Sequence, residues 1–132
     1  MQKGTSILFI NDRLEVLLLL RDNIPTIPYP NMWDLPGGHV EADETPEECI
    51  KREMAEEMGI DLENFHFFSA VAFSDRMEYV FWKQENLNIE TICLTEGQKL
   101  RWFKESEIRE MKLACCFNAV VEAFFREAPF VV

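Results

Sequence analysis

Residues 38–60 read GHVEADETPEECIKREMAEEMGI, and this stretch predicts a helix with both ends marked. Thr45 is a suitable N-cap, with Pro46 at the first helical position and Glu48 placed to bond back to the N-cap amide. Gly59 can adopt the left-handed conformation that ends a helix. The residues that would face a hydrophobic core, four positions apart, are Ile50, Met54 and Met58.

Three glutamates share one side of this predicted helix. Glu53, Glu56 and Glu57 have the i, i+3, i+4 spacing of neighbours on a helix surface. Glu57 lies about 20° from Ile50 on the helical wheel, so its carboxylate would point toward the domain. Carboxylates this close repel one another, and Arg52 alone cannot neutralise three of them. A solvated acidic face is the alternative, but the pattern favours a site for a hard divalent cation such as Mg²⁺ or Mn²⁺.

Two adjacent glycines precede the helix, in residues 33–38, which read WDLPGG. Gly37 and Gly38 would let the backbone approach a ligand closely, and a free carbonyl there can complete the ligand shell of a metal. Taken alone, a glycine pair is equally consistent with a simple turn. Beside three glutamates, it predicts part of a metal site that could hold a polyphosphate.

This stretch resembles the signature of the Nudix hydrolases. That signature runs Gly, five residues of any kind, Glu, seven of any kind, Arg-Glu, an aliphatic residue, any residue, Glu-Glu, any residue, Gly and an aliphatic residue. Met54 occupies a position where the family has a bulky aliphatic side chain. The residues that fill the fixed positions are Gly38, Glu44, Arg52, Glu53, Met54, Glu56, Glu57, Gly59 and Ile60.

The resemblance implies an α/β protein with the Nudix fold, an α/β/α sandwich with a mixed β-sheet. It also implies hydrolysis of a diphosphate linkage, with metal ions that neutralise phosphate charge and activate a water. The residues that would bind Mg²⁺, or Mn²⁺, are Glu53, Glu56, Glu57 and the carbonyl of Gly37. The residues that would support the geometry of the motif are Gly38 and an ion pair between Glu44 and Arg52.

The general base has more than one candidate. Glu56 or Glu57 could accept the proton of the attacking water. Glu96 lies in Leu94–Gln98, which resembles the Glu-Gly-Gln loop of MutT-type members, where the glutamate serves as metal ligand or base. An exposed loop carboxylate without a catalytic role is an equally weighted interpretation of Glu96.

Substrate-binding residues are suggested at two positions. Arg21 ends a predicted strand and could contact phosphate oxygens or form a structural ion pair. Asn118 resembles the asparagine that contacts a purine edge in MutT-type enzymes, although a helix N-cap is the slightly preferred interpretation. Leu35 departs from the bulkier aromatic residue often found there in MutT-type proteins, which weakens the inference of a damaged purine as substrate.

Composition indicates a single globular domain over residues 1–132. The net charge is −11, from 24 acidic and 13 basic residues, and residues 41–61 account for seven of those eleven surplus charges. This balance argues against partners that need a basic surface, namely duplex nucleic acid and anionic membranes.

No apolar run is long enough to span a membrane, and the four cysteines lack metal or disulfide spacing. We expect a cytoplasmic monomer or homodimer with cysteines buried as small hydrophobic residues.

Outside the acidic stretch, the pattern predicts a hairpin, a loop, three further strands and two further helices. Three prolines in residues 22–31 indicate the loop. The unbroken apolar run at 16–20 indicates a strand covered on both faces. The predicted strands are 5–10, 15–21, 65–73, 78–83 and 100–103, and the two helices are 105–111 and 117–127.

We therefore expect a Mg²⁺-dependent pyrophosphohydrolase that acts on a nucleoside triphosphate or another nucleoside-diphosphate derivative. Removal of unwanted nucleotides from the cellular pool, as in MutT-type members, is favoured because the chain has little room for additional elements. One alternative is a Nudix hydrolase of the nucleotide-sugar or ADP-ribose type. Another is a non-catalytic nucleotide-sensing module, which the intact glutamate set disfavours.

Overall fold

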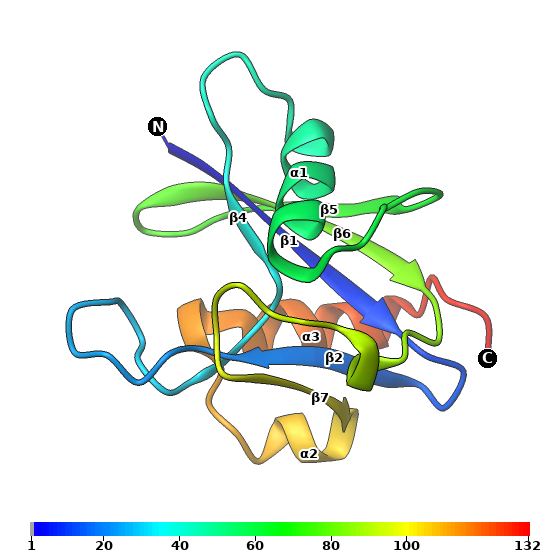
Figure 1. The fold of residues 1–132 in the computed structure, drawn as a ribbon. Coiled ribbons are helices and arrows are strands. Elements are labelled where there is room, and N and C mark those ends of the chain that lie inside the picture. Colours follow the sequence, from blue (N-terminus) through cyan, green and yellow to red (C-terminus); the bar gives the residue numbers. More distant parts are fainter. Residues whose placement is uncertain (1) are drawn as a thin grey trace.

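In the computed structural model, which describes residues 2–132, a seven-stranded mixed sheet lies between α-helices (Figure 1). The strands are β1 (Gln2–Ile10), β2 (Glu15–Leu20), β3 (Trp33–Asp34), β4 (Gly37–His39), β5 (His66–Ala72), β6 (Arg76–Gln84) and β7 (Lys99–Lys104). The α-helices are α1 (Pro46–Met58), α2 (Glu105–Arg109) and α3 (Phe117–Glu127), and 3₁₀ turns occupy Ile89–Thr91 and Ala114–Cys116. The predicted α/β/α sandwich with a mixed sheet is confirmed.

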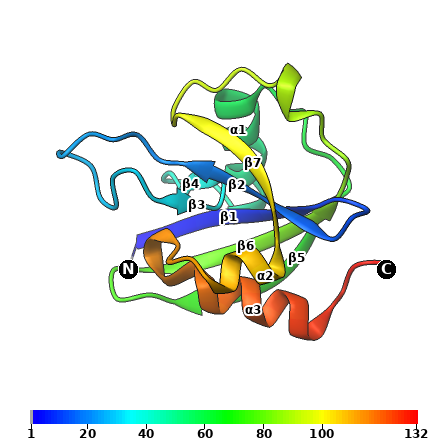
Figure 2. The ribbon, with the colours of Figure 1, turned by 90° about the horizontal axis from the view of Figure 1, so that it is seen from below.

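Alternation along β1 builds a separate hydrophobic core on each face of the sheet. Ile7 and Phe9 pack toward α1, whereas Leu8 and Ile10 pack into the cluster that includes α3. All four side chains are fully buried. Figure 2 shows α1 above the sheet and α2 and α3 below it. The sheet is therefore covered on both faces, as the apolar run in β2 predicted.

The predicted boundaries of α1 are correct at both ends. The Thr45 hydroxyl accepts a hydrogen bond from the Glu48 amide, and the Glu48 carboxylate accepts one from the Thr45 amide. At the other end, Gly59 has φ 66°, a left-handed conformation that closes the helix. With 13 residues, α1 is the longest helix described in 2–132, where no helix has the length and hydropathy to traverse a bilayer.

Strands β1 and β2 separate almost at once after the turn that joins them. The turn at 11–14 is formed as predicted, with the Leu14 amide donating to the Asn11 carbonyl. Only Ile10 and Val16 then pair across the two strands. Beyond that point β1 pairs with β4 and runs parallel to β6, while β2 pairs with β3 and β7. The predicted hairpin is thus correct at its turn and wrong along its length, and the sheet divides into two wings.

The segment that joins the wings contains two short strands that sequence analysis missed. Strand β3 pairs with β2, and strand β4 pairs with β1, so residues 33–39 cross from one wing to the other. The Pro36 carbonyl accepts a hydrogen bond from the Ile7 amide at the crossing. Strands of two and three residues are too short to show an alternating pattern, and glycine and proline are uncommon within strands. Only their pairing with β2 and β1 makes them strands.

The expectation that all four cysteines are buried is wrong. Cys49, on α1, is completely buried, and Cys115 is half-buried, whereas Cys93 and Cys116 are exposed. All four are free thiols. Cys93 lies in an irregular segment and Cys116 ends a 3₁₀ turn, both at the surface, where apolar packing does not decide the residue type.

We predict that Met54→Ala lowers the free energy of unfolding by about 2–5 kcal/mol, because a completely buried side chain would leave a cavity between α1 and the sheet. Urea denaturation of the purified protein measures this change. Lys51→Ala, an exposed position on the same helix, serves as the control and should cost about 1 kcal/mol or less. Equal losses in the two variants would contradict the assigned core face.

Candidate functional site: a carboxylate-lined cleft

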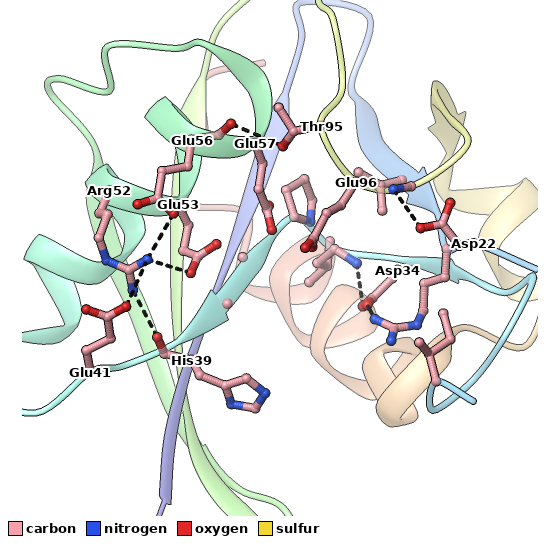
Figure 3. A pocket seen from close by; sticks show the side chains of 18 residues that line it. Asp22, Asp34, His39, Glu41, Arg52, Glu53, Glu56, Glu57, Thr95 and Glu96 are labelled. Carbon is pink, nitrogen blue, oxygen red and sulfur yellow. Dashed lines mark hydrogen bonds and ion pairs between the residues drawn. The ribbon is translucent and has the colours of Figure 1, made fainter. Parts of the chain in front are cut away.

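A cleft of about 660 Å³ opens where the two wings of the sheet separate, a size typical of small-molecule sites (Figure 3). It is bordered by the end of β2, the crossing segment 34–39, α1 and the loop 95–97. Seven carboxylates and two guanidinium groups line it. These charged residues are Asp22, Asp34, Glu41, Glu53, Glu56, Glu57 and Glu96, with Arg21 and Arg52.

Most of the residues predicted for the site line this cleft. They are Gly37, Gly38, Arg52, Glu53, Glu56, Glu57, Glu96 and Arg21. Glu44 lies just outside and contacts Arg52 directly. Segments separated by up to 75 residues therefore meet at one place, as the interpretation of a single site requires.

The glycine pair is required by close packing between β1 and α1. A side chain at Gly38 would overlap the carboxylate of Glu53, and one at Gly37 would overlap the backbone carbonyl of Thr5. The glycines therefore allow β4 to pass directly beneath α1 while pairing with β1. Any larger residue at position 38 would displace Glu53 from its place in the cleft.

Arg52 organises the carboxylates at the outer side of the cleft. It binds Glu44 through two parallel hydrogen bonds, of 2.7 and 3.0 Å, which confirms the predicted ion pair. Its remaining terminal nitrogen contacts Glu53 at 2.9 Å and Glu56 at 3.2 Å. Hydrogen bonds from Arg52, aided by the Glu41 amide, lower the pKa of Glu44 to about 2. Glu44 therefore stays ionised and keeps the guanidinium in one orientation.

Glu57 experiences the opposite environment at the inner side of the cleft. Burial, together with the neighbouring carboxylates of Glu53, Glu96 and Asp34, raises the pKa of Glu57 to about 8. The contacts that Arg52 makes within residues 2–132 reach Glu53 and Glu56 but not Glu57. A positive charge or a proton is therefore needed at this point of the cleft.

The donor set suits a hard divalent cation. All candidate ligands are oxygen atoms, from Glu53, Glu56, Glu57 and the backbone of Gly37, which are the ligands that Mg²⁺ and Mn²⁺ prefer. As they stand in the part of the chain described, no three His, Cys, Asp or Glu side chains converge on one point. Arg52 holds two of the carboxylates instead. The residues fit a cation by their chemistry and by the unbalanced charge at Glu57.

Glu96 enters the cleft from the opposite side. Figure 3 shows its carboxylate directed toward Glu57, between α1 and Asp34. Glu96 belongs to an irregular loop before β7 and is exposed to solvent. It is therefore an exposed loop carboxylate that also lines the cleft, and its role as metal ligand or base stays a prediction.

Sequence analysis missed a buried acid beside Arg21. Asp34 is only 8% exposed, and burial raises its pKa, an effect that the ion pair with Arg21 at 3.0 Å partly opposes. Arg21 also donates to the Pro28 carbonyl at 2.9 Å. The structural ion pair considered for Arg21 is therefore present, and Arg21 lines the cleft as well. The alternation of side chains along a strand could have shown that Asp34 is buried only if the pairing of β2 with β3 had been known.

Asn118 is not the N-cap of α3, and its side chain binds backbone groups of the preceding connection. Its side-chain oxygen accepts a hydrogen bond from the Leu113 amide, and its nitrogen donates to the carbonyls of Ile108 and Met111. The N-cap of α3 is Cys116, so the interpretation of Asn118 as N-cap is wrong. Among the residues described, Asn118 is not one of those that line the cleft, and its amide instead fixes the connection between α2 and α3.

The NUDIX domain model matches residues 1–118. The chain belongs to the NUDIX family. Over 75 residues it is 39% identical to the 8-oxo-dGTP diphosphatase of Escherichia coli, covering 54% of this chain and 57% of that relative. Over 101 residues it is 31% identical to the RNA pyrophosphohydrolase of a Marinomonas species, covering 76% and 56% of the two proteins. The chain spans between about a third and just over half of the length of the curated relatives it matches.

The fold is also that of solved NUDIX structures. The MutT protein from Methanosarcina mazei superimposes with a TM-score of 0.78 at 26% sequence identity. The match covers 98% of this chain and 96% of that protein. The predicted family and fold are therefore both confirmed.

The raised pKa of Glu57 predicts a pH-dependent stability of the metal-free protein. Folded Glu57 keeps its proton up to about pH 8, whereas the unfolded chain releases it near pH 4.5. The stability linked to this proton is present below pH 4.5 and is lost as the pH rises through 8. In the presence of a chelator, we expect the melting temperature of Glu57→Gln to exceed that of wild type by at least about 2 °C above pH 8 and to match it near pH 5.

Differential scanning fluorimetry across this pH range measures the effect. Glu47→Gln removes a carboxylate from the exposed first turn of the same helix and should shift the melting temperature equally at every pH. A constant difference between Glu57→Gln and wild type would show that Glu57 is not protonated in the folded protein.

Proposed function

We propose that this protein is a Mg²⁺-dependent pyrophosphohydrolase that cleaves a diphosphate linkage in a nucleoside triphosphate or a related nucleotide. One observation carries the proposal. Glu53, Glu56 and Glu57 project from α1 into a cleft of about 660 Å³, with Glu96 facing them. Such a concentration of carboxylates, two of them half-buried, calls for cations, and bound cations would attract a polyphosphate.

The residues of the cleft can be given roles in that reaction. Glu53, Glu56, Glu57 and the Gly37 carbonyl would hold Mg²⁺, or Mn²⁺, which when bound would neutralise phosphate charge and lower the pKa of a water. Glu96 or a glutamate of α1 would accept the proton of the attacking water.

Two arginines would assist from opposite sides. Arg52 would keep Glu53 and Glu56 oriented through its pair with Glu44. Arg21, which is 26% exposed in its side chain, would contact phosphate oxygens while its pair with Asp34 is maintained.

Relatives support the choice of substrate class. The 8-oxo-dGTP diphosphatase and the RNA pyrophosphohydrolase described above both carry names that specify nucleotide substrates with linked phosphates. We favour a free nucleoside triphosphate, acted on in the cytoplasm where nucleotide pools are held, over a nucleotide sugar or ADP-ribose. We expect the protein to act as a monomer or a homodimer.

Neutralising the glutamates tests the metal site. We expect Glu53→Gln and Glu57→Gln each to lower the turnover number with Mg²⁺ by roughly 100-fold or more, because each removes a charged ligand without changing the size of the side chain. Glu47→Gln, on the exposed first turn of α1, should retain wild-type turnover. Circular dichroism verifies that each variant is folded. Wild-type turnover in both cleft variants would refute the metal-site assignment.

A substrate panel tests the reaction itself. Nucleoside triphosphates, triphosphate-ended RNA, nucleotide sugars and ADP-ribose are each incubated with the protein and Mg²⁺, and the products are separated by ion-exchange chromatography. We expect pyrophosphate and a nucleoside monophosphate from a triphosphate substrate. Two monophosphate products would indicate the ADP-ribose type of activity instead. Tight binding of one compound without any turnover would indicate the sensing module.

A further inference from the structure

The C-terminal end of α1 is capped by a residue from a distant loop. The last carbonyls of an α-helix lack partners within the helix. Gly59 and Ile60 donate to the carbonyls of Ala55 and Met54, which satisfies two groups near this end. The next two carbonyls belong to the cleft residues Glu56 and Glu57, and both accept hydrogen bonds from Thr95. Its hydroxyl donates to the Glu56 carbonyl at 3.1 Å, and its amide donates to the Glu57 carbonyl at 3.2 Å.

The same loop is attached to the opposite wing of the sheet on the other side of Glu96. The Gly97 amide donates to the carboxylate of Asp22 at 3.3 Å, and the Gln98 amide donates to the Leu20 carbonyl at 2.8 Å. The side-chain nitrogen of Gln98 donates to the Arg21 carbonyl and to the side chain of Asn31, both at 2.8 Å. The loop thus bonds to β2 and to the loop that follows it.

Glu96 is the single residue between these two attachments. Gly97 has φ +86° and rests against Leu19, where a side chain would collide, so the backbone turns sharply directly after Glu96. Figure 3 shows the result, with the Glu96 carboxylate directed toward Glu57 across the cleft. Residues 95–98, which we call the strap, span the opening between α1 and β2.

We propose that the strap is a positioning device in which Thr95 and Gln98, neither of them a ligand, hold Glu96 opposite the glutamates of α1. Thr95 would do so by anchoring the strap to the backbone of the same two residues, Glu56 and Glu57, whose side chains enter the cleft. Gln98 would do so by anchoring it to the other wing. This proposal rests on the proposed function, in which Glu96 acts as metal ligand or base.

The physical reason for two anchors is the repulsion between the facing carboxylates. The Glu96 carboxylate lies close enough to help raise the pKa of Glu57, so ionising both groups at once is unfavourable, and an unanchored loop would relieve this by moving Glu96 away from Glu57. Hydrogen bonds on both sides oppose this displacement. Since one anchor is the end of α1 itself, Glu96 and the glutamates of that helix keep their relative positions even if the two wings move.

The first experiment removes one hydroxyl from the strap. Thr95→Val keeps the branched shape and the backbone amide but deletes the bond to the Glu56 carbonyl. We expect Mn²⁺ binding, measured by isothermal titration calorimetry without substrate, to weaken by roughly three- to tenfold, and turnover with Mg²⁺ to fall by a similar factor. Thr95→Ser should restore both quantities, because it restores the hydroxyl.

A matched control is available in the same protein. The hydroxyl of Thr91 likewise donates to a backbone carbonyl, that of Asn88 at 2.8 Å, in an exposed 3₁₀ turn outside the cleft. Thr91→Val should leave Mn²⁺ affinity and turnover unchanged.

For the other anchor, Gln98→Leu should reproduce the effect of Thr95→Val. Gln84→Leu, which removes bonds of similar length to Val131, should leave Mn²⁺ affinity and turnover unchanged.

A double-mutant cycle separates positioning from general destabilisation. If Thr95 acts through Glu96, Thr95→Val should have no further effect on Mn²⁺ affinity or turnover once Glu96 has been changed to Gln. Effects that multiply in the double variant would overturn the strap proposal, and so would wild-type Mn²⁺ affinity in Thr95→Val. Failure of the proposed function is recognised separately, because wild type would then hydrolyse none of the compounds in the panel.

Discussion

The separation of β1 from β2 after the single pair Ile10–Val16 is the constraint on which the cleft depends. Two adjacent strands that continued to pair would leave no space between them. Because the free edge of β1 is taken by β4, and that of β2 by β3, residues 33–39 must cross the gap and bring two glycines beneath α1. The small size of these glycines then sets how close Glu53 lies to the sheet. Fold and cleft are thus linked through backbone pairing rather than through the carboxylate side chains.

Charge in the cleft is divided between an outer and an inner region. Arg52 satisfies the outer carboxylates and keeps Glu44 ionised, whereas the half-buried Glu57 lies among other carboxylates that help raise its pKa to about 8. The net charge of −11 therefore describes the molecule poorly, since seven of those charges are concentrated in residues 41–61. A cleft of this kind repels a polyphosphate when it is empty and would attract one when cations fill it. Affinity for phosphate then depends on the metal, which links the two binding events.

Local rules predicted α1 and its glutamates because all of the necessary information lies within about fifteen residues. The capping box, the spacing of Ile50 and Met54, and the stop at Gly59 are independent of the rest of the chain. The parallel pairing of β1 with β6 joins residues more than 70 positions apart, and no local pattern encodes it. Asp34 was missed, and Asn118 was wrongly interpreted as an N-cap, for the same reason. Asp34 gains its role from a strand partner, and the Asn118 amide binds backbone groups whose positions only the folded connection defines.

The two walls of the cleft differ in a way that bears on specificity. In the wall formed by α1 and β4, neighbouring residues limit one another. Position 38 must be glycine because the carboxylate of Glu53 occupies the space that a side chain there would need. The opposite wall includes the loop 22–31, where Ile24 and Tyr29 are nearly half exposed and three prolines limit the conformations of the backbone. That loop is held near its ends, by the pair of Arg21 with Asp34 and by the bond of Gln98 to Asn31, and at Pro28, whose carbonyl accepts a hydrogen bond from Arg21. Exposed side chains such as those of Ile24 and Tyr29 can differ without disturbing the carboxylates, so this wall is where the proposed hydrolase would be adapted to different nucleosides.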